Sequence, residues 1–144
     1  MKLLIDTNIL LDVLQKRENY CGMSSLVWKL CETGRVEGVV SALSFANLVY
    51  VMRKSLDPGQ IGSVLEMLRL IFSIADLTEA DLLNAARKQW DDFEDALQST
   101  TAERISADRI ITRNVMDFQK SGVKAVTPSE FLVEYGLQHL YEKS

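Results

Sequence analysis

The first acidic residue of the chain comes directly after an apolar run. Asp6 follows residues 3–5 (LLI), and apolar residues resume at Ile9. A carboxylate that follows a buried strand so closely is a candidate catalytic or metal-binding group. It is equally a candidate helix cap, because an aspartate before Thr7 can accept a hydrogen bond from the first turn of a helix. Taken alone, Asp6 does not decide between these interpretations.

Three further acids occupy comparable positions. Asp92 and Asp95 lie three residues apart at the start of an expected helix, so they share one of its faces. Asp117 comes shortly after residues 111–114 (ITRN), where an expected strand ends at Thr112. Like charges a few ångströms apart raise each other's pKa, and a Mg²⁺ or Mn²⁺ ion relieves that repulsion while leaving coordination positions for phosphate oxygens. Together, these acids indicate metal-assisted phosphodiester hydrolysis.

Strands that alternate with helices would bring these acids together. Short apolar segments predict strands over residues 2–5, 37–41, 72–75, 109–112 and 123–126. Helices are predicted over residues 7–15, 20–33, 42–54, 58–70, 78–90 and 92–106, and a last one begins near Thr127. Short strands that are apolar on both faces indicate an α/β fold with a parallel sheet covered on both sides. Ligands of such sheets gather at the carboxyl ends of the strands, where Asp6 lies.

The helical patterns also predict which side chains are buried. In the helix over 20–33 the candidates are Leu26, Trp28 and Leu30, and in the helix over 92–106 they are Phe93, Ala96, Leu97 and Thr100. The two cysteines, Cys21 and Cys31, are expected to be ordinary thiols, because ten residues along one helix separate them beyond disulfide reach.

The composition is that of an ordinary globular protein, with 47% hydrophobic and 25% charged residues. The 144 residues are most economically one domain over 1–144, with the last few residues disordered. The apolar runs are too short to cross a membrane and the start does not have the pattern of a signal peptide, so we expect a cytoplasmic protein. The net charge of −4 argues against binding nucleic acid by bulk attraction. A polyanionic substrate would therefore need a local basic rim or a metal ion.

Four sequence blocks, in this order, resemble the PIN domain family. They are residues 3–8 (LLIDTN), 41–48 (SALSFANL), 95–97 (DAL) and 111–118 (ITRNVMDF). Within that family the chain is similar to the small VapC-type toxins of toxin–antitoxin pairs, from Met1 to about Phe131. The resemblance implies a three-layer α/β/α fold with a central, mostly parallel sheet of four to five strands. It also implies an endoribonuclease that depends on Mg²⁺ or Mn²⁺, forms a homodimer and has a cognate antitoxin as protein partner.

The resemblance also implies roles for particular residues. Asp6 and Asp95 match the first and third acids of the family's site, and Asp117 can substitute for a further one. The implied set comprises catalytic Asp6, Asp95, Asp117 and Thr112, with the three acids as metal ligands; supporting Thr7, Asn8, Asn47, Asp92 and Asn114; and Arg113 as an RNA contact.

Two positions depart from the family pattern. Asn47 stands where the family usually has a glutamate, and Asn114 where many members have an acid. An asparagine offers a carbonyl oxygen but no charge, so a second hypothesis stays open: a degenerate PIN domain that binds RNA or a protein partner without cleaving. A third hypothesis is a haloacid-dehalogenase-like phosphatase. It would need an aspartate two positions after Asp6, where this chain has Asn8.

Overall fold

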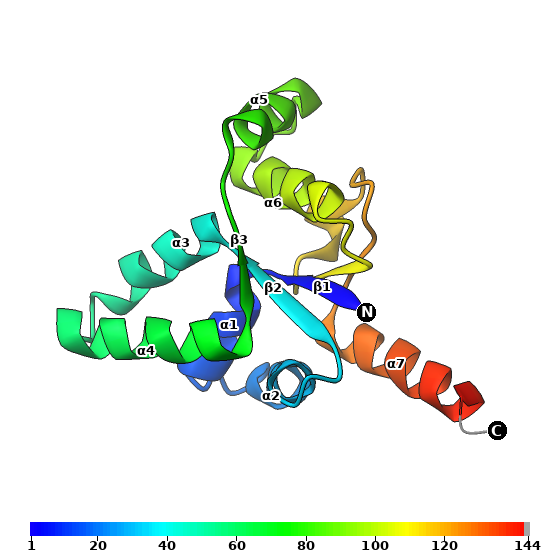
Figure 1. Cartoon of the computed structure of the whole chain (residues 1–144), viewed down its shortest axis with the longest axis horizontal. Coiled ribbons are helices and arrows are strands. Elements are labelled where there is room, and N and C mark those ends of the chain that lie inside the picture. The colour runs from blue at the N-terminus through cyan, green and yellow to red at the C-terminus, as the bar shows by residue number, and fades with distance from the viewer. Residues whose placement is uncertain (143–144) are drawn as a thin grey trace.

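Five parallel strands form the centre of the protein (Figure 1). The structure, a computed structural model, describes the backbone of residues 1–142 and the side chains of residues 1–136; the disorder predicted for the last few residues lies outside this description. The strands are β1 (Lys2–Ile5), β2 (Glu37–Ser41), β3 (Ser73–Ala75), β4 (Arg109–Ile111) and β5 (Ala125–Val126). Their order across the sheet is β3-β2-β1-β4-β5, and each neighbouring pair is parallel. The predicted parallel sheet is confirmed.

Seven α-helices and one 3₁₀ helix connect these strands within residues 1–142. They are α1 (Thr7–Leu14), α2 (Cys21–Glu32), α3 (Ala42–Met52), α4 (Pro58–Ile71), α5 (Glu79–Lys88), α6 (Phe93–Arg104), the 3₁₀ helix η1 (Val115–Phe118) and α7 (Pro128–Glu142). Local capping explains where several begin: Asp57 starts α4 and Thr78 starts α5, each with a complete capping box. None of the helices described is long and apolar enough to cross a membrane.

Helices cover both faces of the sheet, which gives three layers. In Figure 1, α1 to α4 lie on one side of the strands, and α5 and α6 lie on the other. The side chains of β1 alternate accordingly. Leu3 and Ile5 belong to the core shared with α1, α2 and α3, whereas Leu4 belongs to the core that includes Ala102 of α6 and Phe118 of η1. The predicted α/β/α arrangement is therefore confirmed.

Two side chains that the helical patterns predict in the core are exposed instead. Leu26 is 49% exposed, because the buried face of α2 runs through Ser24, Val27 and Cys31, a different stripe of the helix. Phe93 is 45% exposed, because it is the first residue of α6 and the buried face starts only beyond the first turn. The other predicted core residues are at least half-buried: Trp28, Leu30, Ala96, Leu97 and Thr100.

Both cysteines are free thiols, as predicted. Cys31 is buried in the larger core, and this burial raises the pKa of its thiol to about 12. Cys21 is half-buried, and its Sγ lies 3.5 Å from Ser25 Oγ on the same helix. Burial therefore keeps the Cys31 thiol protonated, which makes it a poor nucleophile.

Candidate active site

Asp6 leaves the carboxyl end of β1 and is held in place by hydrogen bonds. Its backbone N–H donates to the Ile111 carbonyl of β4 (3.0 Å). Its carboxylate accepts from the Thr112 hydroxyl at Oδ2 (2.8 Å) and from the Thr7 backbone N–H at Oδ1 (2.9 Å). Asp6 is thus the N-cap of α1 and also a fixed carboxylate at the edge of the sheet. The interpretation of Asp6 as a helix cap is confirmed, and its role as a catalytic or metal-binding group stays a prediction.

A second group of polar side chains supports Asp6 from the interior. Gln98 of α6 is 5% exposed, and its Nε2 donates to Ser44 Oγ (3.0 Å) and to Asp6 Oδ1 (3.4 Å). Ser44 Oγ also accepts from the hydroxyls of Thr7 (2.9 Å) and Ser41 (3.2 Å). Burial raises the pKa of Asp6, and the hydrogen bonds to its carboxylate act in the opposite direction. The site therefore contains a half-buried acid whose carboxylate is oriented by hydrogen bonds.

Gln98 and Ser44 were not predicted as parts of the site. The run of four polar residues at 98–101 (QSTT) in an expected helix was a signal in the sequence, and in the structure all four are buried. A buried polar run of this kind requires partners, and Asp6 and Ser44 are the partners of the Gln98 amide nitrogen. Its Oε1 has no hydrogen-bond partner among the described residues.

Asp95 has the strongest electrostatic signature in the site. It lies in the first turn of α6, and its backbone N–H donates to Asp92 Oδ1 (3.0 Å), so that Asp92 is the N-cap of this helix. Burial, followed by the charges of the Asp92, Asp117, Asp6 and Glu94 carboxylates, raises the pKa of Asp95 to about 7. Acids from β1's end, α6 and η1 therefore act on one carboxyl group, as the sequence predicts.

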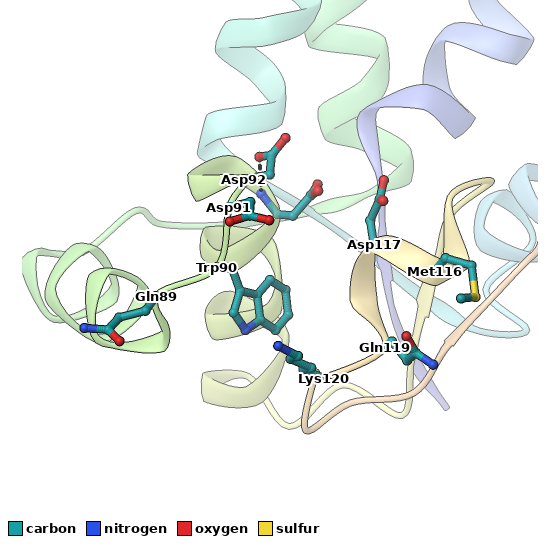
Figure 2. Close-up of a pocket in the computed structure, with 9 residues that line it drawn as sticks. Gln89, Trp90, Asp91, Asp92, Met116, Asp117, Gln119 and Lys120 are labelled. Atoms are coloured by element: carbon teal, nitrogen blue, oxygen red, sulfur yellow. Dashed lines mark hydrogen bonds between the residues drawn. The ribbon is translucent and has the colours of Figure 1, made fainter.

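Asp95 and Asp117 line one open cleft of about 260 Å³ (Figure 2). Carboxylates are the ligands that Mg²⁺ and Mn²⁺ prefer, and a cation would relieve the repulsion that raises the pKa of Asp95. The chemistry of the donor set therefore fits such an ion. The described side chains contain no group of three or more His, Cys, Asp or Glu placed closely enough to hold a metal by themselves, so water would have to complete the coordination.

The three asparagines predicted to support the site make few contacts. Asn47 Nδ2 lies 3.5 Å from Glu94 Oε2, a long and exposed hydrogen bond. Asn114 contributes its backbone N–H, which donates to Thr112 Oγ1 (3.1 Å). The Asn8 side chain is half-buried and has no hydrogen bond among the described residues.

Arg113 contacts a buried acid and does not line the cleft of Asp95. Its Nε lies 3.2 Å from Asp12 Oδ2, and its guanidinium carbon lies 4.1 Å from the centre of the Tyr20 ring. Asp12 is fully buried; Ser24 Oγ donates to it (3.1 Å), and Arg17 Nη1 lies 3.6 Å away. Asp12 was not predicted as a buried ion-pair residue, although its place within the apolar stretch of α1 was a signal in the sequence. An RNA contact by Arg113 stays a prediction.

A family model described as "PIN domain" matches residues 2–116. The chain belongs to the PIN domain family. The predicted family is thereby confirmed, and members of this family are generally nucleases. Among curated proteins, no sequence matches that of this PIN domain.

Solved structures of toxin–antitoxin proteins share the fold of this PIN domain. The structure of VapBC-1 from nontypeable Haemophilus influenzae has 21% sequence identity and a TM-score of 0.68, covering 90% of this chain and 99% of the other. VapBC2 from Rickettsia felis, bound to a DNA fragment from its promoter, has 18% identity and a TM-score of 0.68, covering 88% and 98%. VapC20 from Mycobacterium tuberculosis, described as a sarcin-ricin-loop-cleaving toxin, has 11% identity and a TM-score of 0.61, covering 75% and 86%.

Proposed function

We propose that this PIN domain is a metal-dependent endoribonuclease and the toxin of a VapBC-type toxin–antitoxin pair. The observation that supports this most is the convergence of acids on Asp95, whose pKa rises to about 7 through burial and the charges of Asp6, Asp92, Asp117 and Glu94. A protein keeps such a costly cluster when a cation or a proton transfer uses it. Family membership favours the cation.

The acids that hold the ion would be Asp6, Asp95 and Asp117, with water bridging the ion to those that do not reach it directly, and with Mg²⁺ or Mn²⁺ as the metal. When bound, the ion stabilises charge on the scissile phosphate and activates the attacking water. Thr112 donates to Asp6 Oδ2 and the N-terminus of α1 to Oδ1, so Asp6 is already oriented without the ion. Asp117 is exposed on η1 and is the most adjustable of the three.

The test is cleavage of single-stranded RNA with Mn²⁺ or Mg²⁺ by the wild-type protein and by Asp6→Asn and Asp95→Asn. Both variants should lose metal-dependent cleavage while keeping their fold by circular dichroism. Asp76→Asn is a matched control, because Asp76 is exposed and its carboxylate has no partner among the described residues. Cleavage that persists unchanged in both site variants would contradict this assignment.

A degenerate PIN domain that binds RNA or a protein partner without cleaving is the second candidate. Asn47 favours it, because this residue bonds to Glu94 and adds no charge to the site. The two candidates differ in metal binding. If calorimetry detects no Mn²⁺ binding at millimolar concentrations and a chelator leaves RNA binding unchanged, the degenerate protein is the correct interpretation.

The similar structures of toxin–antitoxin complexes support the proposal of an antitoxin as partner. We also propose that the protein is a cytoplasmic homodimer. A small DNA-binding protein encoded immediately upstream should co-purify with this chain and inhibit its ribonuclease activity. Light scattering of the purified chain tests the dimer, and a monomer at all concentrations would contradict it.

A further inference from the structure

The cleft of Asp95 and Asp117 also has a wall that is not acidic. Gln89 adopts a left-handed conformation (φ 57°) at the end of α5, and the chain leaves the helix so that Trp90 lines the cleft. Lys120, which follows η1, lines the same cleft and extends toward Trp90 in Figure 2. One end of the cleft is thus built from carboxylates and the other from an indole ring and an ammonium group.

The Trp90 ring is half-buried and has two side-chain contacts in this position. It packs edge-on against Phe118, with 6.4 Å between the ring centres and 74° between the planes. Lys88 Nζ lies 5.7 Å from the centre of the Trp90 ring, and Glu103 in turn holds this ammonium group at 2.6 Å. An aromatic ring that is packed in this way and lines an open cleft offers a stacking surface, because its side chain loses little conformational entropy when a ligand binds.

Lys120 is a free cation. It is exposed, and it has no ion pair or hydrogen bond among the described residues. By contrast, the nearby Lys88 is occupied by Glu103. Within the cleft lining, Lys120 is therefore the cation available to an anionic group of a ligand.

We propose that this wall binds one unpaired nucleotide of an RNA strand, with its base stacked on Trp90 and its phosphate next to Lys120. The volume of about 260 Å³ lies slightly below the usual range for ligand sites and suits one nucleotide better than a duplex. Stacking on aromatic side chains requires an unstacked base, so the ligand is single-stranded. The inference rests on the proposed ribonuclease function and adds the position of a nucleotide beside the carboxylates.

Tryptophan fluorescence tests the stacking directly. The chain contains two tryptophans, Trp28 and Trp90. The Trp28→Phe variant leaves Trp90 as the sole reporter, and Trp28 itself packs edge-on against Phe72 in the core. With divalent ions removed by a chelator, a short single-stranded RNA should quench the Trp90 fluorescence of this variant, whereas the same sequence as a duplex should not. Trp90→Phe, which retains Trp28, should show no quenching.

Affinity measurements test the phosphate contact. Lys120→Ala should lower the slope of log affinity against log salt by about 0.7, the value expected for one phosphate on a single strand. Lys54→Ala is a matched control, because Lys54 is exposed, has no partner among the described residues and does not line the cleft. Trp90→Leu should weaken binding about tenfold. If this variant is unfolded, the fluorescence of Trp28→Phe and the Lys120 comparison still decide the question.

These experiments separate this inference from the proposed function. Absence of quenching by single-stranded RNA at any accessible concentration, or a salt slope identical in Lys120→Ala and wild type, overturns the nucleotide site even if the protein cleaves RNA. Quenching by free arginine and not by RNA assigns the cleft to a cationic side chain of a partner protein, which also overturns it. A protein that binds RNA as described but does not cleave it refutes the nuclease and leaves the nucleotide site intact.

Discussion

Replacing Asp95 by asparagine should stabilise the metal-free protein, and the gain should depend on pH. Its pKa is about 7 in the fold against an ordinary value of 3.8, and one pKa unit corresponds to about 1.36 kcal/mol. The full shift would correspond to about 4 kcal/mol, but this carboxyl is only half-buried and solvent screens it, so we expect a gain of about 1–2 kcal/mol. Asparagine removes the charge and keeps the shape of the side chain.

The sign of the pH dependence follows from the two protonation states. Between about pH 4 and pH 7 the Asp95 carboxyl of the unfolded chain is ionised while that of the folded chain keeps its proton. Wild type therefore loses stability across this window relative to Asp95→Asn, and the difference is constant above about pH 7. It is absent below the ordinary pKa, where both states are protonated.

Urea unfolding followed by circular dichroism, at about pH 4.5 and about pH 8 in a chelator, measures the difference. Glu66→Gln is the matched control, because Glu66 is exposed on α4 and has no partner among the described residues. Adding Mn²⁺ at the higher pH should stabilise wild type and not Asp95→Asn. An equal effect of the Asp95→Asn substitution at both pH values would refute the reasoning that burial and the neighbouring carboxylates raise the pKa of this group.

Three other substitutions test the support of the site and the packing of the fold. Gln98→Leu removes the amide that donates to Asp6 Oδ1, and calorimetry should show Mn²⁺ affinity falling about tenfold; unchanged affinity would exclude a positioning role for Gln98. Asp12→Asn leaves the half-buried Arg113 without its carboxylate and should cost about 3 kcal/mol in urea unfolding, and a cost below about 1 kcal/mol would show that this ion pair contributes little. Gly38→Ala places a methyl group 2.6 Å from the sulfur of Cys31 and 2.7 Å from the ring of Phe72, so overpacking should lower the free energy of unfolding by about 1–3 kcal/mol. An unchanged thermal unfolding temperature would show that the core relaxes there.

The order of strands and helices was predictable because it depends on local signals. The apolar residues of β1 and β4 stand out from the polar residues that follow them, and the caps at Asp57 and Thr78 lie where their side chains can reach the third residue of the helix. Parallel pairing then places the ends of β1 and β4 side by side, so the meeting of Asp6 and Thr112 follows from the topology.

Residues whose environment depends on distant segments were not predictable in the same way. Leu26 and Phe93 are apolar, and only the packing of α2 and α6 decides that they are exposed. Gln98 is 92 positions from the acid it contacts, so the local pattern of α6 could show a buried polar residue but not its partner. Asp12 likewise pairs with Arg113, which follows the carboxyl end of β4 and lies far from Asp12 in the sequence.

Asn47 shows how the site differs from a complete set of acids. Its amide is directed to Glu94 and not to Asp6. The site therefore has one negative charge fewer on the side of α3 than a site with glutamate at this position, and the hydrogen bonds of Asp6 do not involve this residue. A glutamate at this position would add another carboxylate to those that already raise the pKa of Asp95. The asparagine therefore lowers the repulsion that the metal-free fold must bear, at the expense of one ligand. Binding of the ion by Asp6, Asp95 and Asp117 is therefore the property that distinguishes the nuclease from the degenerate protein.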